Sequence, residues 1–493
     1  MYNHLVIDVL KSFTKKDVKR FREFLNSPYH NKSEKLIKFY DALIKFYPTF
    51  NSASFTIENI QKKISPSSSF NNSTMLNQMS FLLKASQNYL VQNRITKKEI
   101  ELTDFLRAEL FERKLNNLLQ MNIRRTNEKL EKEKIINAEY FLNKIKLSTD
   151  ALNFININKP RSNRVYINDN INKLTERGMY ITYLFVTEIL KEFDNLRTLE
   201  NSFDIDEKNF IFQLFEKINF SEILKFLASN SGNKVLLKIF ETYYYFFNAF
   251  SNFDDERNYL IYKKYLLENQ AFLSTDEIRF HFGRLVRYCM QKSLNEVAFH
   301  KYESELFNVY NFILTNGYYK SEVSNYLPVE LYRTVLLLAL KLRKFKWTME
   351  FIKKFKSKVH PDRRRNMYYY SLAHYYFNRR MYEDTIKSFH KVDLNHFLFK
   401  VDMKNLMLMT YYELNEFEPA LSLIDSYKQF LSHDKILTSN RKKQYREFVN
   451  TLHKMILYKT SAISINKKLI EKKLVQMPFR DWLSRKLLEI DNK

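Results

Sequence analysis

The sequence has very little glycine and proline. Its 493 residues include eight prolines and only four glycines, namely Gly178, Gly232, Gly283 and Gly317. Sheet-rich folds and α/β enzymes use glycine in tight turns and where the backbone approaches a ligand closely. The scarcity therefore favours helices joined by short polar turns. Glycines this far apart also cannot form a P-loop or a GxGxxG phosphate-binding turn.

Cysteine and long apolar runs are scarce as well. The single cysteine, Cys289, excludes an internal disulfide framework and a multi-cysteine zinc site. Its apolar neighbours predict a buried small side chain rather than a reactive thiol. The most apolar windows are too short to span a bilayer, and the first residues lack the features of a signal peptide. We therefore expect a soluble, cytoplasmic protein that makes no membrane contact.

No motif for catalysis or metal binding is found. HExxH, GxSxG and CxxC patterns are all missing from the sequence. The segment "HKVDLNH" brings His390, Asp393 and His396 together, but a spacing of six places the two histidines on different helical faces. A metal site needs three or four convergent ligands, and no isolated carboxylate pair suggests a general acid and base. We expect no enzymatic activity, no metal and no cofactor.

Apolar and aromatic residues are abundant. Hydrophobic residues make up 45% of the chain and aromatic residues 16%, enough for a continuous core. Apolar positions recur with helical periodicity, and no segment alternates like a strand. The expected fold class is all-α, a solenoid of helical hairpins with a small N-terminal module. The expected segments are a helical module at 1–95, irregular hairpins at 96–232, divergent helical repeats at 233–328, regular repeats at 329–430 and capping helices at 431–493.

The start of the chain carries clear helix boundary signals. Thr14 and Asp17 have capping-box spacing, and Ser27-Pro28 ends the helix that they begin. Short helices with basic faces could form a DNA-reading helix-turn-helix. No compact turn with glycine separates two of these helices, which favours a helical cap on a larger array.

Three segments near the C-terminal end align as repeats. The alignment places Phe345, Tyr382 and Phe417 in register, 37 and 35 residues apart. The middle segment, "YYSLAHYYFNRRMYEDTIKSF", adds an aromatic residue, Leu-Ala and a second aromatic residue in its first helix. This pattern resembles the tetratricopeptide repeat, which has a period of about 34 residues. The resemblance implies that Tyr369 and Tyr376 are core residues of the first helix in the middle segment. Leu336 and Leu408 depart from this pattern, because they stand where the repeat has a small residue.

The chain is also similar in plan to an uncharacterised family of bacterial helical-repeat proteins. The similarity consists of an early "FLNSPYHN" segment together with repeats at the C-terminal end. This resemblance implies no known activity.

The tetratricopeptide resemblance implies a concave groove lined by the first helix of each pair. Stacked helix pairs present such an elongated surface to their partners. Within each helix the predicted side chains are spaced by four, which places them on one face. The predicted groove consists of Arg333, Leu337, Lys341, Tyr370, His374, Asn378, Asn405, Met409 and Glu413.

The net charge of +26 points to a second possible surface. Residues 341–365 hold eleven Lys and Arg but only two acidic residues. Such a run is usually a solvated helix face, but it can also bind a polyanion. The predicted polyanion patch consists of Lys353, Lys356, Arg363, Arg364 and Arg365. Two functions therefore follow from the sequence: a protein-interaction scaffold with an unidentified protein or peptide partner, and alternatively an RNA- or DNA-binding protein.

Overall fold

The structure is a computed structural model that contains only helices in the residues it describes. Those residues hold 24 α-helices and no strand, which confirms the all-α prediction. The described ranges are 4–65, 71–133, 135–158, 164–200, 209–230, 232–293, 299–321, 324–393, 397–434, 437–460, 467–474 and 477–490.

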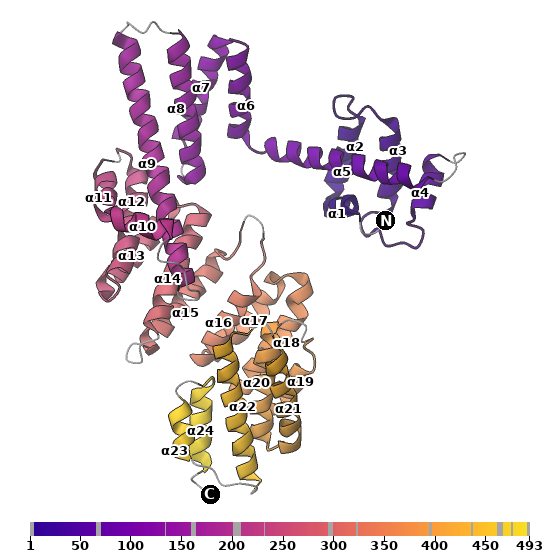
Figure 1. Ribbon diagram of the computed structural model, residues 1–493, viewed down its shortest axis with the longest axis vertical. Helices are drawn as coiled ribbons and strands as arrows, with labels where there is room; N and C mark the ends of the chain where they lie inside the picture. Colours follow the sequence, from indigo (N-terminus) through magenta and orange to yellow (C-terminus); the bar gives the residue numbers. More distant parts are fainter. Residues whose placement is uncertain are drawn as a thin grey trace. The chain divides into compact units, whose positions relative to one another are not determined.

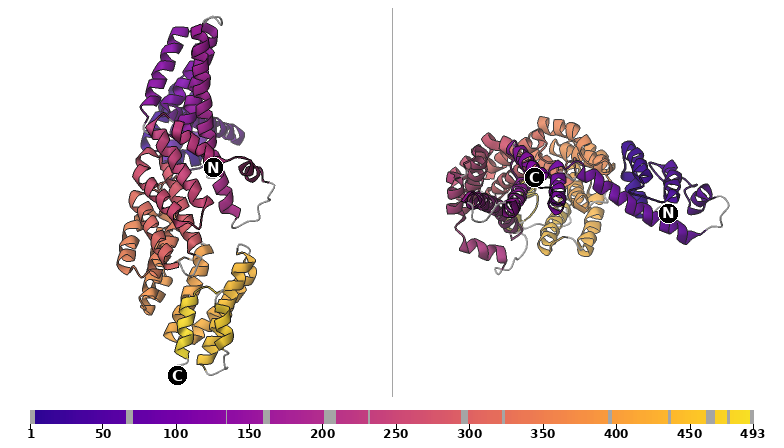
Figure 2. Two further views of the ribbon diagram at one scale, coloured as in Figure 1. Left: turned by 90° about the vertical axis from the view of Figure 1, so that its left-hand side faces the viewer. Right: turned by 90° about the horizontal axis from the view of Figure 1, so that it is seen from above.

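The chain divides into two compact units, Met1–Phe220 and Ser221–Lys493. Figures 1 and 2 show the helices of both units coloured along the sequence. The finer division into five segments remains a prediction, as does the solenoid arrangement.

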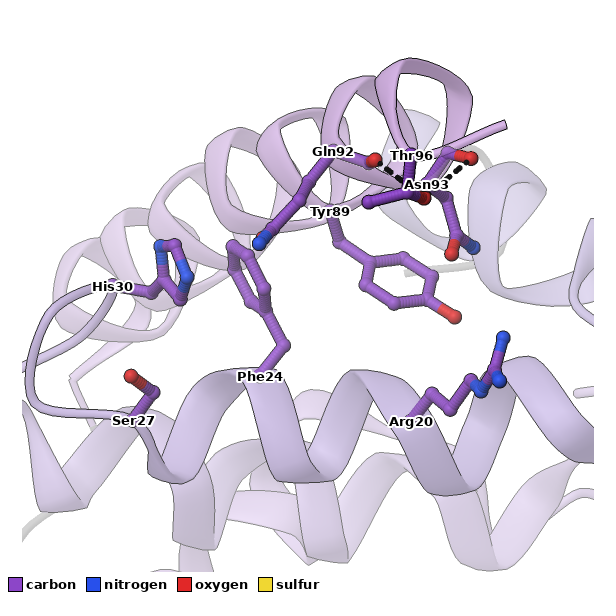
Figure 3. Close-up of a pocket in the computed structure, with 8 residues that line it drawn as sticks. All are labelled: Arg20, Phe24, Ser27, His30, Tyr89, Gln92, Asn93 and Thr96. Atoms are coloured by element: carbon purple, nitrogen blue, oxygen red, sulfur yellow. Dashed lines mark hydrogen bonds between the residues drawn. The ribbon is translucent and has the colours of Figure 1, made fainter. Parts of the chain in front are cut away.

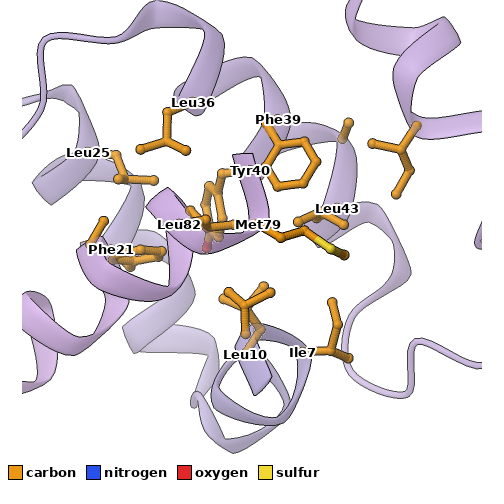
Figure 4. Packing of buried hydrophobic residues seen from close by; sticks show 14 of the residues in the cluster. Ile7, Leu10, Phe21, Leu25, Leu36, Phe39, Tyr40, Leu43, Met79 and Leu82 are labelled. Carbon is orange, nitrogen blue, oxygen red and sulfur yellow. The ribbon is translucent and has the colours of Figure 1, made fainter. Parts of the chain in front are cut away.

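The first unit begins with a five-helix module. Its helices are α1 (Leu5–Ser12), α2 (Lys15–Asn26), α3 (Glu34–Leu43), α4 (Ile57–Ile64) and α5 (Asn72–Ile95). Side chains from the module's helices form one hydrophobic core, part of which is shown in Figure 4. Phe21 and Tyr40 meet edge to face at its centre, with ring centroids 5.1 Å apart.

The predicted capping box at the start of α2 is confirmed. The Asp17 backbone N–H donates to Thr14 Oγ1 at 3.1 Å, and the Thr14 N–H donates to Asp17 Oδ2 at 2.9 Å. The hydroxyl of Tyr89 on α5 also donates to Asp17 Oδ1, at 3.0 Å. The helix ends at Asn26, before Ser27-Pro28, as the sequence predicts.

Five further helices complete the first unit. They are α6 (Glu99–Glu112), α7 (Asn116–Glu131), α8 (Ala138–Asn158), α9 (Arg164–Glu200) and α10 (Phe210–Lys217). Helices α8 and α9 run side by side over much of their length (Figures 1 and 2). Arg107 on α6 is buried between α7 and α8, where it contacts Asp150 and Thr126.

In the second unit most helices pack against the next one in the chain. The first five are α11 (Phe220–Asn230), α12 (Lys234–Ser251), α13 (Glu256–Asn269), α14 (Thr275–Lys292) and α15 (Phe299–Asn316). The next six are α16 (Val329–Lys341), α17 (Phe345–Phe355), α18 (Pro361–Asn378), α19 (Tyr382–Phe389), α20 (Phe397–Leu414) and α21 (Phe417–His433). The last three are α22 (Ser439–Lys459), α23 (Lys467–Leu474) and α24 (Arg480–Ile490).

Four of the helix pairs are joined by the same tight turn. In each turn one residue has the left-handed backbone conformation, with a positive φ. The residue after it donates its N–H to the carbonyl five residues earlier, as Met381 does to Tyr376 at 2.9 Å. Glycine normally occupies that left-handed position, but this glycine-poor chain uses other residues. They are Lys114, Arg343, Arg380 and Asn415, with φ between 55° and 60°.

The predicted repeat register agrees with these turns. The three aligned aromatic residues, Phe345, Tyr382 and Phe417, are the first residues of α17, α19 and α21. Each stands two residues after a left-handed position. The three aligned residues therefore occupy equivalent places in their helices.

Candidate functional site

The first helices of the three aligned pairs contact one another in the second unit. Helix α18 packs against both α16 and α20. Arg333 on α16 forms a two-point ion pair with Asp402 on α20, with Nη2 2.7 Å from Oδ1. The hydroxyl of Tyr370 on α18 donates to Asp402 Oδ2 at 2.7 Å. A single carboxylate thus links three helices.

His374 lies one turn after Tyr370 on α18 and is buried. Its ring centroid is 4.5 Å from that of Tyr370, and its Nε2 has no hydrogen-bond partner in the described part of the chain. Burial lowers the pKa of His374 to about 4, with Asp402 opposing and Arg333 reinforcing that shift. The imidazole is therefore neutral at physiological pH.

These contacts correct the predicted groove. Tyr370, His374, Asn405 and Met409 are buried rather than facing solvent, so a partner cannot reach them in this structure. The cause is the packing of α16, α18 and α20, whose contact surface includes the face that the repeat pattern assigns to a groove. The hydroxyl of Tyr427 on α21 also covers Asn405, donating to its Oδ1 at 3.0 Å.

The same correction applies to the tyrosines of α18. The repeat pattern assigns core positions to Tyr369 and Tyr376, but the structure leaves both half-buried and buries Tyr370 completely. The buried face of α18 is thus turned by about one residue from the predicted one, which corresponds to about 100° on a helix.

The remaining groove residues are dispersed. Glu413 accepts a hydrogen bond from Trp482 Nε1 at 2.7 Å and forms an ion pair with Lys486 at 2.7 Å, both on α24. Lys341 forms an ion pair with Glu303 on α15 at 2.6 Å. Leu337 is half-buried, and Asn378 is exposed at the end of α18. The structure therefore does not bring the nine predicted residues together as one open surface.

The predicted polyanion patch spans the connection between α17 and α18 together with the adjoining ends of both helices. Lys353 lies in the last turn of α17, Lys356 in the connection, and Arg363, Arg364 and Arg365 at the start of α18. All of these residues except Arg364 are exposed. Arg364 is half-buried and donates to two carbonyl groups that precede α18, Val359 O at 2.8 Å and Ser357 O at 2.9 Å. It therefore holds the turn in place rather than presenting charge to a partner.

Two further lysines extend this surface. Lys354 and Lys358 lie between the predicted residues and are exposed. Both belong to the run of Lys and Arg noted in residues 341–365 of the sequence. We refer to residues 353–365 as the basic turn. Within the described ranges, no acidic side chain forms an ion pair with its exposed lysines and arginines; Asp362 instead lies 3.5 Å from His360. The exposed cations are Lys353, Lys354, Lys356, Lys358, Arg363 and Arg365.

A cleft of about 490 Å³ lies in the N-terminal module, between α2 and α5. Figure 3 shows Phe24 and Tyr89 at its centre, with His30 beside Phe24. The Phe24 and His30 rings are stacked, with centroids 4.1 Å apart and planes 12° apart. The cleft thus offers an aromatic surface with a polar rim. Its lining is Arg20, Phe24, Ser27, His30, Tyr89, Gln92, Asn93 and Thr96.

No arrangement for metal or thiol chemistry occurs among the described residues. No group of three His, Cys, Asp or Glu side chains is placed to hold a metal ion there. His396 lies outside the described residues, so the "HKVDLNH" segment is seen only in part. Cys289 is buried as predicted, and burial raises the pKa of its thiol to about 12. In the described ranges, no helix has the length and apolar character needed to cross a membrane.

Comparison with known proteins returned no match. No protein-family model matches the sequence, and neither a curated protein nor a solved structure is significantly similar to it.

Proposed function

We propose that this protein binds nucleic acid through the basic turn of its second unit. The observation that supports this proposal is the set of six exposed lysines and arginines within thirteen residues, none of them in an ion pair with a described acidic side chain. Cations that are not neutralised within the protein can displace the counterions of a phosphate backbone. The net charge of +26 favours the same partner, since it raises the rate of association with polyanions.

The proposal includes a tetratricopeptide-like arrangement of residues 329–430. In that arrangement the basic turn connects the second helix of one repeat to the first helix of the next. Arg364 fixes the backbone of the turn through its bonds to Val359 and Ser357. A fixed turn presents its charges with less loss of conformational entropy on binding than a free loop would.

A protein-interaction scaffold, the other function expected from the sequence, has weaker support. Its expected groove includes Tyr370, His374, Asn405 and Met409, all of which are buried. A scaffold that binds through another surface is compatible with the fold, but the nine predicted groove residues do not support it.

The test measures binding to fluorescent RNA and DNA oligonucleotides at salt concentrations from about 50 to 300 mM. The variant combines Lys353→Gln, Arg363→Gln and Arg365→Gln, which removes three exposed charges. We expect the slope of log affinity against log salt to decrease in magnitude by about 2 to 3. The control variant combines Lys15→Gln, Lys16→Gln and Lys19→Gln on α2, which lowers the net charge equally.

The control variant should bind nearly as tightly as the unmodified protein. Equal losses in the two triple variants would show that only net charge matters, which would contradict a site at the basic turn. An absence of binding to either nucleic acid at the lowest salt concentration would also rule out the proposal.

A further inference from the structure

Helix α9 carries an apolar stripe that the fold of its own unit leaves in solvent. The stripe follows alternating spacings of four and three residues, which is the a/d pattern of a coiled-coil helix. Its five large side chains are each between 42% and 56% exposed. We call this stripe the α9 seam; it consists of Ile167, Ile171, Leu174, Gly178, Ile181 and Phe185.

The side of α9 that faces α8 is more polar than the seam over the first half of the helix. The hydroxyl of Tyr166 donates to Asn156 Oδ1 on α8 at 2.8 Å, and Lys173 pairs with Glu176. A surface helix normally buries its apolar face and exposes its polar one. The reversed arrangement indicates that the seam is the contact surface for another helix.

The residues that flank the seam favour a second copy of this chain as the partner. Two chains of charge +26 repel each other, and this repulsion is weakest where the contact surfaces lack exposed cations. Five of the six flanking residues are uncharged, and the exception, Arg177, is half-buried with its Nε shielded from water. The uncharged flanking residues are Asn168, Asn170, Thr175, Thr182 and Leu184.

The seam is also complementary to itself when one copy is reversed. Its spacings read the same in both directions, so an antiparallel pair aligns every a position with a d position of the other copy. Leu174 then lies opposite Gly178, where an added Cβ meets nothing within 4 Å in the free chain. Ile171 lies opposite Ile181, and Phe185 opposite Ile167. A parallel pair would instead place Gly178 opposite itself and leave a gap.

We propose that the protein forms an antiparallel homodimer through the α9 seam, with a twofold axis near residue 176. The seam is about 27 Å long at 1.5 Å per residue. An isologous contact of this kind closes on itself and does not form fibres. Six residues per copy are few compared with the 20–30 of a standard interface, so we expect a dissociation constant in the range of about 1 to 100 µM.

Sedimentation equilibrium on the full chain, from about 1 to 200 µM, tests the association. The unmodified protein should show a monomer–dimer equilibrium. Leu174→Glu should weaken dimerisation at least about tenfold, because it would bury an unpaired charge. The control is Leu260→Glu on α13, which changes an equally exposed leucine outside the seam and should dimerise normally.

Disulfide trapping of the double variant Ile171→Cys, Ile181→Cys tests the orientation. The antiparallel dimer should give links between position 171 of one copy and 181 of the other, identified by peptide mass spectrometry. Links from 171 to 171 would show a parallel pair and overturn the proposal. The proposal would also be overturned if the protein were a monomer at every concentration. The same holds if Leu174→Glu dimerised as strongly as the unmodified chain.

Discussion

Arg333 and Asp402 are separated by 69 residues in the sequence, yet they form a two-point ion pair that joins the first and third of three neighbouring helices. Tyr370, from the helix between them, donates to the same carboxylate. Asp402 is buried, whereas Arg333 retains some contact with solvent. Because this carboxylate accepts hydrogen bonds from α16 and α18 at once, it fixes how both helices pack against α20.

Removal of this carboxylate should destabilise the second unit. In Asp402→Ala the Arg333 guanidinium and the Tyr370 hydroxyl both lose the contact with this carboxylate, which should cost about 3 kcal/mol of unfolding free energy. Asp402→Asn should cost less, because the amide oxygen can still accept from Tyr370. Urea denaturation monitored by circular dichroism measures the change as a shift of midpoint at constant slope. Identical midpoints for Asp402→Ala and the unmodified protein would show that the ion pair does not stabilise the unit.

His374 should make stability depend on pH. Its folded-state pKa of about 4 lies below the ordinary value of 6.5, so the unfolded chain takes up a proton first as the pH falls. The stability is therefore complete above pH 6.5 and decreases toward pH 4, by a total of about 3 kcal/mol. Denaturation midpoints at about pH 7.5 and pH 5 measure this effect.

The matched variant for this prediction is His374→Leu. Because Nε2 of His374 has no described partner, leucine should be tolerated at neutral pH. Between the two pH values, the stability of the variant should decrease much less than that of the unmodified protein. At lower pH its stability should still decrease, because Asp17 and other carboxylates become protonated. An ordinary histidine titrates roughly between pH 7.5 and pH 5. If the variant and the unmodified protein lose the same stability over this span, His374 is not the cause of the pH dependence.

The sequence was most informative where local chemistry determines local structure. The capping box of Thr14 and Asp17 and the end of α2 before Ser27-Pro28 depend on a few adjacent residues, and both are confirmed. The all-α class likewise follows from periodicity and from scarce glycine. These features require no knowledge of which helices become neighbours.

The face of each helix that becomes buried could not be read in the same way. Tyr369 and Tyr370 are adjacent residues of the same type, and only contact with α16 and α20 decides that Tyr370 is the buried one. The partner of Arg333 lies four helices later in the chain, so no spacing within a single helix identifies it. The exposed cations of the basic turn, by contrast, were identifiable because charged side chains without partners remain at the surface.

Glycine should stabilise the turns in which this chain uses other residues. Arg380 has φ of 60°, a conformation that costs an L-residue with a Cβ roughly 1 kcal/mol. Arg380→Gly should therefore raise the unfolding free energy by about 0.5 to 1 kcal/mol, despite the greater entropy of glycine in the unfolded chain. Arg380→Ala is the control, because it removes the charge but keeps the Cβ. Equal midpoints for the two variants in urea would contradict this explanation.

Replacement of Arg107 should also destabilise the protein. Arg107 is 2% exposed and contacts two carboxylates, Asp104 and Asp150. Arg107→Met would fill the space but remove the guanidinium from both carboxylates, of which Asp104 keeps Lys146 and Asp150 is partly exposed, and should cost about 1 to 3 kcal/mol. Arg107→Lys should recover only part of this loss, because an ammonium group cannot reproduce the forked geometry of a guanidinium. Urea denaturation of the three proteins ranks them. A lysine variant as stable as the unmodified protein would show that charge alone, without guanidinium geometry, holds α6 against α8.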